Sequence, residues 1–292
     1  MCKLLGYSRQ AYYAQLKEKV YRNFDDELII LLILQVREQL KRAGTDQLMK
    51  VLKDDFESLN IKIGRDALIA LQSRYGVLIR PKKKRRCITT LSDHPFYKYS
   101  NLIKDLSVLS CNHVWVSDIT YVWVEGEQRF VYLMLITDVY SRYIVGYHVS
   151  EDMTADSIVK GLETALENTP AEKRKALIHH SDRGVQYCSS LYTGRLQQEG
   201  IAISMTQNGD PLENAIAERI NRTIKDDFTT ERELQFDTFR QAERFLGEAV
   251  EVYNNIRPHS SVSYLTPAIA YEGKHELKRM WKSYYKKKQV DI

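Results

Sequence analysis

Three acidic residues occupy places in the sequence where a carboxylate can do chemistry. Asp118 interrupts the β-branched and aromatic segment 113–124, Asp182 follows the predicted short strand 175–181, and Glu218 lies in an amphipathic segment. A carboxylate is costly to bury in a strand unless a cation or a basic group meets it. Carboxylates are also the hard ligands that Mg²⁺ prefers, and three of them can hold two ions about 4 Å apart around a phosphodiester. The three residues therefore predict a catalytic, metal-binding site that takes two Mg²⁺ ions, with Mn²⁺ as a substitute.

The segment that carries Glu218 has two distinct faces if it forms a helix. Ile216, Ile220 and Ile224 recur every four residues and predict the buried stripe. At about 100° per residue, Glu218 points roughly 200° away from Ile216 and thus away from this stripe. One face would then offer a carboxylate for metal and cations for phosphate. The residues that share the side of Glu218 are Asn214, Arg222 and Lys225.

The elements that must position the three acids follow one recognisable order. The periodicity changes from helical to alternating after about residue 110, which predicts a strand-rich domain. Three strands with short links predict an antiparallel meander, and two further strands are reached through helices. This order predicts an α/β fold, a ribonuclease-H-like core with a five-stranded mixed sheet flanked by helices. The expected elements are strands over 113–124, 129–140 and 142–150, a helix over 154–169, a strand over 175–181, a helix over 189–200, a strand over 201–205 and a helix over 212–228.

The remaining domains are predicted on either side of this core, which we place at residues 111–230. Residues 1–80 have apolar positions at helical spacing, which predicts an all-helical, helix-turn-helix-like DNA-binding region. One helix is expected to begin at Asp25 or Asp26, another to cover residues 45–60, and the helix over residues 65–75 to enter the DNA groove. A plain helical packing domain is the alternative. Residues 81–110 form a basic linker, and residues 231–292 a helical extension with a basic tail that either contacts DNA or is solvated.

Charge is distributed unevenly along the chain, whose net charge is +5. Residues 1–105 carry a net charge of +9, residues 106–273 carry −9, and residues 274–292 carry +5. Basic ends around an acidic centre suit a polyanion held by the flanks and a cation held in the middle. The basic run in the linker is either a solvated connection or a phosphate-binding strap. Its candidate DNA-binding residues are Lys82, Lys83, Lys84, Arg85 and Arg86.

Several classes of protein are disfavoured by composition. No run of about 18 apolar residues exists, so we expect no membrane span. The amino-terminal segment lacks the apolar block and cleavage site of a secretory signal. The four cysteines form no Cys-x-x-Cys pair, which argues against a zinc site and a disulfide framework. We therefore expect a cytoplasmic protein with reduced thiols.

Local sequence around the three acids resembles one family, the transposases of the insertion sequence 3 family. The segments that carry the resemblance are WVSDITY, HSDRGVQY, NGDPLENAIAERINRTIKDDF and YNNIRPHSSVSYLTPAIAYEG. Thirty-five residues separate Asp182 from Glu218, as in retroviral-type integrases, and Lys225 stands where the family has a basic residue seven positions after the glutamate. The resemblance extends over nearly the whole chain. Arg219 departs from it, because many relatives have Ser there.

The resemblance implies a DDE transposase whose triad Asp118, Asp182 and Glu218 binds two divalent cations. Such an enzyme nicks one strand at each element end, and the exposed 3′-hydroxyl then attacks a second phosphodiester. The implied partners are double-stranded DNA, further copies of the chain in a homo-oligomer on DNA, and an upstream-frame protein or fusion. The implied location is the bacterial cytoplasm, with the protein on the nucleoid when it is bound to DNA.

Several other residues are compatible with either a functional or a structural role. Asp138 either supports the metal site or opens a turn, and His180 either touches DNA or makes a structural hydrogen bond. Arg183, beside the flexible Gly184, is a candidate phosphate contact, and Arg257 lies in a DNA-facing turn or a packing corner. Mobility of the loop 206–211 would let Glu218 settle only when DNA and metal bind.

Two other functions are compatible with the sequence. The chain could be a non-catalytic DNA-binding regulator derived from a transposase, or a ribonuclease-H-like nuclease that only hydrolyses. The intact triad together with Lys225 favours an enzyme, because loss of one acid would be the first mark of decay. The basic helical head and the 35-residue spacing favour a transposase over a simple nuclease.

Overall fold

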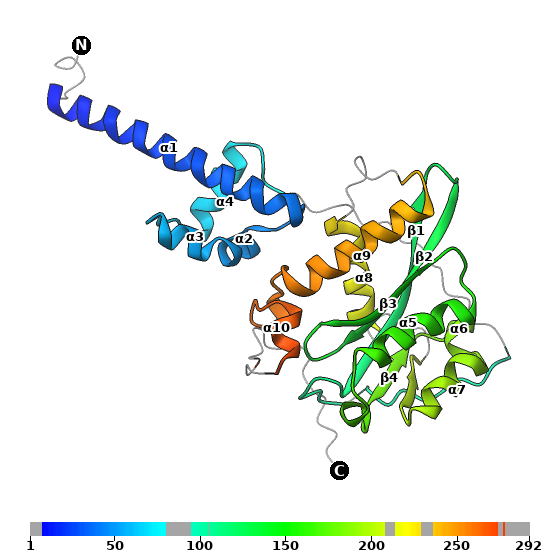
Figure 1. Ribbon diagram of the computed structural model, residues 1–292. Helices are drawn as coiled ribbons and strands as arrows, with labels where there is room; N and C mark the ends of the chain where they lie inside the picture. The colour runs from blue at the N-terminus through cyan, green and yellow to red at the C-terminus, as the bar shows by residue number, and fades with distance from the viewer. Residues whose placement is uncertain are drawn as a thin grey trace. The chain divides into compact units, whose positions relative to one another are not determined.

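A computed structural model describes residues 8–79, 95–104, 106–207, 214–228 and 236–273, together with Leu277. The basic run 82–86, residues 208–211 of the predicted loop and the tail beyond 277 lie outside the described residues. The chain divides into two compact units, Met1–Lys83 and Lys84–Ile292 (Figure 1). No helix in the described ranges is long and apolar enough to cross a membrane.

The first unit consists of helices only, as predicted. It contains α1 (Arg9–Gln39), α2 (Thr45–Val51), α3 (Lys53–Ser58) and α4 (Arg65–Arg74). Ile33, Leu48, Leu52 and Leu68 are almost completely buried and form its centre. Arg37 on α1 donates to the Gln72 side chain on α4 at 2.9 Å, which adds a polar tie to the apolar packing.

Two details of the first unit differ from the sequence-based expectation. A helix start at Asp25 or Asp26 was expected, but α1 continues through both residues, because residues 9–39 contain neither Gly nor Pro to end it. The next expected helix is instead two short helices, α2 and α3, which meet at Leu52 with φ −88° and ψ 8°. Leu52 is almost fully buried, so core packing holds the break in place.

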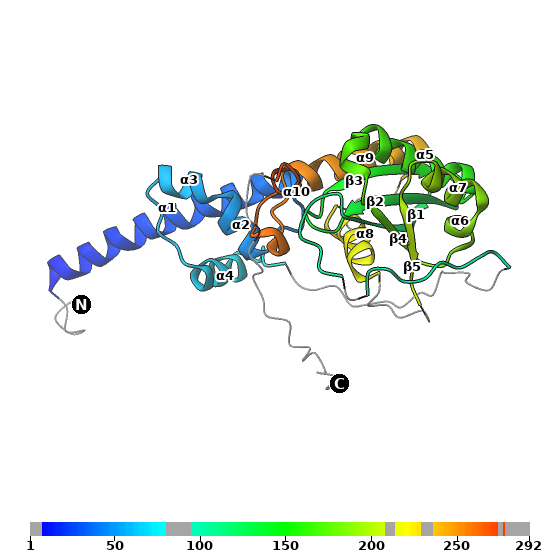
Figure 2. The ribbon, with the colours of Figure 1, turned by 90° about the horizontal axis from the view of Figure 1, so that it is seen from below.

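The second unit is built on a five-stranded mixed sheet, which confirms the predicted ribonuclease-H-like fold (Figure 2). Its strand order is β3-β2-β1-β4-β5. The β1–β2 and β2–β3 pairs are antiparallel, whereas β1–β4 and β4–β5 are parallel. The strands are β1 (Val114–Val124), β2 (Arg129–Asp138), β3 (Ile144–Ser150), β4 (Ile178–Ser181) and β5 (Ala202–Met205).

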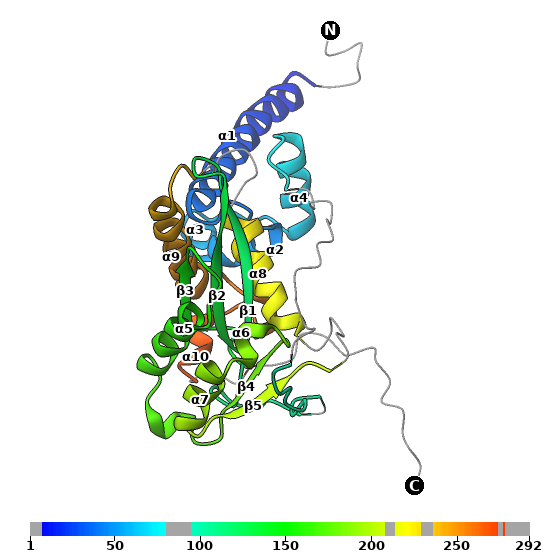
Figure 3. The same cartoon turned by 90° about the vertical axis from the view of Figure 1, so that its right-hand side faces the viewer.

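Helices cover both faces of this sheet. α5 (Ala155–Glu167) and α7 (Ser190–Gln198) bury one face around Trp115, Met134 and Leu162. On the other face α8 (Ala215–Phe228) runs alongside β1 (Figure 3) and packs through Ala217 against Val114 and Val116. The short elements are η2 (Ala171–Arg174), α6 (Val185–Cys188), η3 (Ser260–Val262) and α10 (Pro267–Tyr271).

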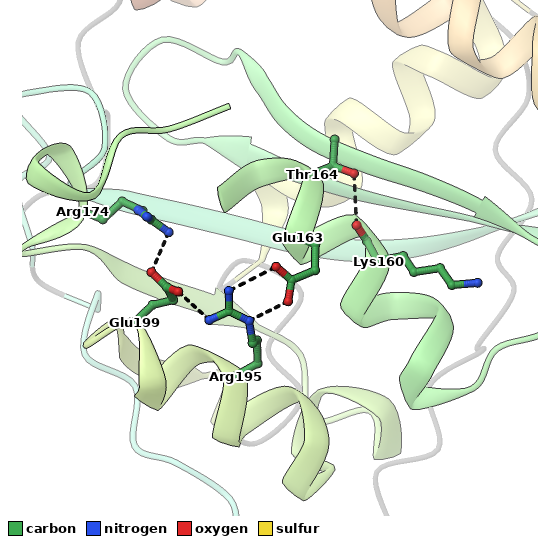
Figure 4. Close-up of polar contacts among 6 residues, drawn as sticks. All are labelled: Lys160, Glu163, Thr164, Arg174, Arg195 and Glu199. Carbon is green, nitrogen blue, oxygen red and sulfur yellow. Dashed lines mark hydrogen bonds and ion pairs between the residues drawn. The ribbon is translucent and has the colours of Figure 1, made fainter. Parts of the chain in front are cut away.

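A charged network joins α5 to α7 on the first of these faces (Figure 4). Arg195 on α7 forms two hydrogen bonds with Glu163 on α5, from Nε at 2.5 Å and from Nη2 at 3.1 Å. Its Nη1 donates to Glu199 at 2.5 Å, and Glu199 also pairs with Arg174 at 2.8 Å. These two carboxylates raise the pKa of Arg195, Glu163 being the larger cause.

A buried asparagine is one of the residues that tie the carboxy-terminal extension to the core. α9 (Phe239–Asn255) carries the buried Asn254, whose Nδ2 donates to the Ile144 carbonyl at 3.1 Å. The Oδ1 atom of Asn254 accepts from the Ile144 amide at 3.0 Å. Both polar ends of this buried amide are therefore satisfied, which fixes α9 beside the start of β3.

Candidate active site

Asp118 lies in the middle of β1, where the sequence predicted it. Val114, Val116 and Asp118 alternate with residues of the opposite face, so Asp118 is on the same face as α8. Its Oδ2 atom accepts a hydrogen bond of 2.8 Å from Asn221 Nδ2 on α8. The strand and the helix that carries Glu218 thus meet at the Asp118 carboxylate.

Asp182 follows directly after β4, the strand next to β1. β1 and β4 run parallel, and Val116 pairs with His180. Asp118 and Asp182 each lie two residues beyond this pair, so both fall at the same place along neighbouring strands. The Gly184 amide donates to Asp182 Oδ1 at 2.9 Å, and a Cβ at Gly184 would lie only 3.1 Å from that oxygen. Glycine therefore allows the backbone to approach this carboxylate closely.

Glu218 lies in the first turn of α8 with an exposed side chain. Partial burial is the largest cause that raises its pKa, the positive charge of Arg222 lowers it, and the negative charge of Asp182 raises it. The pKa of Asp118 is raised to about 7, first by burial, then by the charge of Asp182 and, less strongly, by that of Glu218. The hydrogen bond from Asn221 acts in the opposite direction. The negative charge of Asp182 thus raises the pKa of both other acids.

The buried face of α8 differs in part from the expected stripe. Ile220 and Ile224 are buried as predicted, whereas Ile216 is only half-buried. Ala217 and Asn221 complete the buried face. Asn221 was not among the predicted site residues, although a polar residue one turn from Ala217 and Ile224 on an apolar stripe is a usable signal.

The three acids are chemically suitable ligands for a divalent cation. Asp118, Asp182 and Glu218 offer hard oxygen ligands whose mutual repulsion a cation would relieve. Across the described ranges, however, no group of three His, Cys, Asp or Glu side chains lies close enough together to hold a metal ion. Binding of a metal ion by all three acids would therefore need their carboxyl groups to come closer together.

The predicted DNA-binding residues fall in several places. Arg222 on α8 is exposed and Lys225 on the same helix is half-buried. Asn214 is buried, and its Nδ2 donates to the Ser117 carbonyl of β1 at 3.1 Å. Arg183, next to Asp182, and Arg257, just after α9, are half-buried. DNA contact by any of these side chains, and by the basic run 82–86, stays a prediction.

Two residues with open interpretations have structural hydrogen bonds. Asp138 is buried, and its Oδ1 accepts from Ser141 Oγ at 2.6 Å and from the Ser141 amide at 2.8 Å. Its Oδ2 accepts from the Asn112 amide at 2.7 Å, so Asp138 opens a turn. His180 is buried and bonds through Nδ1 to Ser204 Oγ at 2.8 Å.

Known protein families match the part of the chain that carries the three acids. The integrase core domain family matches residues 110–211, and a second family with the same description matches residues 199–267. Among solved structures, the HTLV-2 integrase catalytic core domain in complex with magnesium has a TM-score of 0.44 and 17% identity. That alignment covers 56% of this chain and 98% of the integrase core domain.

Curated relatives come from bacterial insertion sequences. The insertion element IS600 uncharacterized 31 kDa protein of Shigella sonnei is 33% identical over 95% of this chain and 99% of its own length. The transposase for IS629 of Shigella sonnei is 32% identical over 72% of this chain, which spans 64% of that relative. The transposase InsF for IS3A of Escherichia coli K12 is 25% identical over 77% of each chain. With these matches, the chain belongs to the integrase-like transposases of insertion sequences, in the insertion sequence 3 family.

Proposed function

We propose that Asp118, Asp182 and Glu218 are the catalytic, metal-binding triad of this transposase, which cleaves DNA at the ends of an insertion sequence and transfers the cut strand. The observation that carries the proposal is geometric: the parallel register of β1 and β4 puts Asp118 and Asp182 at the same place along neighbouring strands, and Asn221, on the helix of Glu218, donates to Asp118. Two Mg²⁺ ions, once bound there, would activate the attacking oxygen and stabilise the leaving oxygen.

The residues of the chain have separate tasks in this reaction. Asp118 and Asp182 are held at adjacent strand positions, Asp118 by Asn221 and Asp182 by the Gly184 amide. Glu218 approaches them from α8 and completes the ligand set. Arg222 and Lys225, on the helix of Glu218, bind DNA phosphates and orient the scissile bond toward the carboxylates.

The test is a strand-transfer assay with the full chain, Mg²⁺ or Mn²⁺, and DNA that carries the element ends. Asp118→Asn, Asp182→Asn and Glu218→Gln should each abolish cleavage and joining, because each removes an anionic ligand. Glu172→Gln on η2, which also neutralises an exposed carboxylate, is the matched control and should keep activity. Circular dichroism checks that each variant is folded.

The products also distinguish the competing functions. Joined strands support transposition, nicks alone indicate a nuclease, and a mobility shift without cleavage indicates a binding protein. Retained cleavage in any one of the triad variants would remove that residue from the proposal. We further propose that DNA is held by a homo-oligomer and that an upstream-frame protein assists, which co-purification on element-end DNA would test.

A further inference from the structure

Asn221 is a polar residue on the buried face of α8. Its side chain is only 4% exposed, and it lies one turn from the buried Ala217 and Ile224. Asn221 Nδ2 donates to Asp118 Oδ2 at 2.8 Å. Asn221 Oδ1 is buried and has no hydrogen-bond partner among the described residues. Packing alone would favour an aliphatic side chain here, because a buried amide with an unsatisfied oxygen lowers the stability of the fold. The hydrogen bond to Asp118 therefore indicates a role other than packing.

The place of Asn221 on the helix relates it to the other carboxylates. Asn221 follows Glu218 by three residues, so the two side chains are neighbours on one side of α8. Four residues before Glu218, Asn214 donates to the Ser117 carbonyl. Two amides thus join α8 to consecutive residues of β1, and Glu218 lies between them along the helix. Only the amide of Asn221 reaches a carboxylate.

We propose that Asn221 is a positioning residue for the divalent-cation site: it holds the Asp118 carboxylate in one orientation and couples it to the helix of Glu218. This inference rests on the proposed function, because it takes Asp118 and Glu218 as ligands. A carboxylate turns easily about its Cβ–Cγ bond. A charge-assisted hydrogen bond to one oxygen restricts that rotation and leaves lone pairs on both oxygens for a cation.

A purely structural role has a clear counterpart in the same unit. Asn254 is also 4% exposed, and its amide bonds a backbone amide and carbonyl rather than a carboxylate. A structural asparagine affects unfolding, whereas a positioning asparagine also affects cation binding. Asn254→Leu is therefore the matched control for Asn221→Leu, since both replace a buried amide with an apolar side chain of the same branching.

The experiment measures Mn²⁺ binding by the full chain without DNA, from the rise in Tm with Mn²⁺ concentration and from calorimetric titration. Removing a residue that orients a metal ligand weakens metal affinity by about 10- to 100-fold. Asn221→Leu should therefore raise the half-saturating Mn²⁺ concentration about tenfold or more. Asn254→Leu should lower the metal-free Tm and leave half-saturation unchanged. Wild-type half-saturation in Asn221→Leu would overturn the positioning role.

A second variant decides the matter if Asn221→Leu does not fold. Asn221→Asp keeps the shape of the side chain and puts a second carboxylate beside Asp118. Its metal-free Tm should be lower and its Mn²⁺-induced rise in Tm larger than in the wild type. A wild-type Tm and a wild-type rise would reject the proposal. Asp118→Asn distinguishes failure of the positioning role from failure of the proposed function. If Asp118→Asn binds Mn²⁺ as the wild type does, Asp118 is not a metal ligand and the proposed function itself fails.

Discussion

At the scale of single residues, acidic side chains on β1, after β4 and on α8 carry charges that repel one another. Burial and the charge of Asp182 raise the pKa of Asp118 to about 7, although Asn221 donates to it. Arg222 offsets part of the corresponding effect on Glu218. The divalent cations of the proposed function would relieve this repulsion between the carboxylates.

Lys225 is predicted to contribute to DNA affinity rather than to chemistry. It lies two turns after Glu218 on α8 and is half-buried. Lys225→Ala should weaken DNA binding about equally for all sequences and reduce the slope of log affinity against log salt by about 1, because one phosphate contact is lost. Fluorescence anisotropy at several salt concentrations measures this slope.

The control for Lys225 is Arg244→Ala on α9. Arg244 is exposed and already paired with Glu248 at 2.9 Å, so its loss should leave the slope unchanged. If Lys225→Ala keeps the wild-type slope, the lysine has no phosphate contact.

At the scale of elements, the start of α5 combines the N-cap residue Thr154 with a carboxylate, that of Asp152. Asp152 Oδ1 accepts from Ser157 Oγ at 2.6 Å and from Thr154 Oγ1 at 2.7 Å, and these bonds lower the pKa of Asp152 to about 2. Because the folded pKa lies below the unfolded value of about 3.9, the ionised form stabilises the fold. That contribution is complete above about pH 4 and is lost as the pH falls toward 2.

Asp152→Asn should therefore lower the free energy of unfolding at pH 7 by less than about 1 kcal/mol, since the carboxylate is solvent-exposed. The difference from the wild type should shrink as the pH falls below about 4. Urea unfolding from pH 3 to pH 7 measures it. Asp156→Asn removes the same charge from the first turn of α5 and should not reproduce the pH dependence. A pH-independent difference would contradict the explanation.

The network around Arg195 is predicted to stabilise the packing of α5 on α7. Arg195 is 24% exposed and joins Glu163 and Glu199, so Arg195→Met removes this partner from Glu163 and leaves Glu199 with Arg174. We expect Arg195→Met to lower the free energy of unfolding by about 1 kcal/mol. Arg244→Met breaks an exposed pair within α9 and should cost no more than about 0.5 kcal/mol. Equal losses in chemical denaturation would show that the network adds nothing beyond a surface pair.

At the scale of the whole molecule, the chain has two units with separate apolar centres. Leu48 is fully buried in the first unit and Leu162 in the second. All three tryptophans, Trp115, Trp123 and Trp281, belong to the second unit, so tryptophan fluorescence reports that unit alone.

Leu162→Ala should lower the free energy of unfolding of the second unit, followed by tryptophan fluorescence, by about 2–5 kcal/mol, because it leaves a cavity in the core. Leu48→Ala creates a comparable cavity in the other unit and should leave that transition in place. Hydrogen exchange should then show lost protection in residues 25–79 only. A shift of the tryptophan transition by Leu48→Ala would mean that the two units unfold together.

The sequence alone determined the order of elements and the candidate triad. The predicted strands and helices of the second unit agree with β1 to β5, α5, α7 and α8 to within a few residues, because alternation and helical periodicity are local properties. The spacing of Asp182 and Glu218 within familiar motifs indicated the family, which the comparisons confirmed. The short helix α6 and the break at Leu52 were not predicted, because no periodic pattern marks a single turn.

Only the tertiary structure decided which side chains meet. The parallel register of Val116 and His180 brings Asp118 beside Asp182, and no local pattern states that register. The contact between Asn221 and Asp118 joins residues 103 positions apart, so it depends on how α8 packs against β1. Local propensity fixes where each element begins and ends, whereas burial of the apolar face of α8 selects which polar groups are carried into contact with the strand.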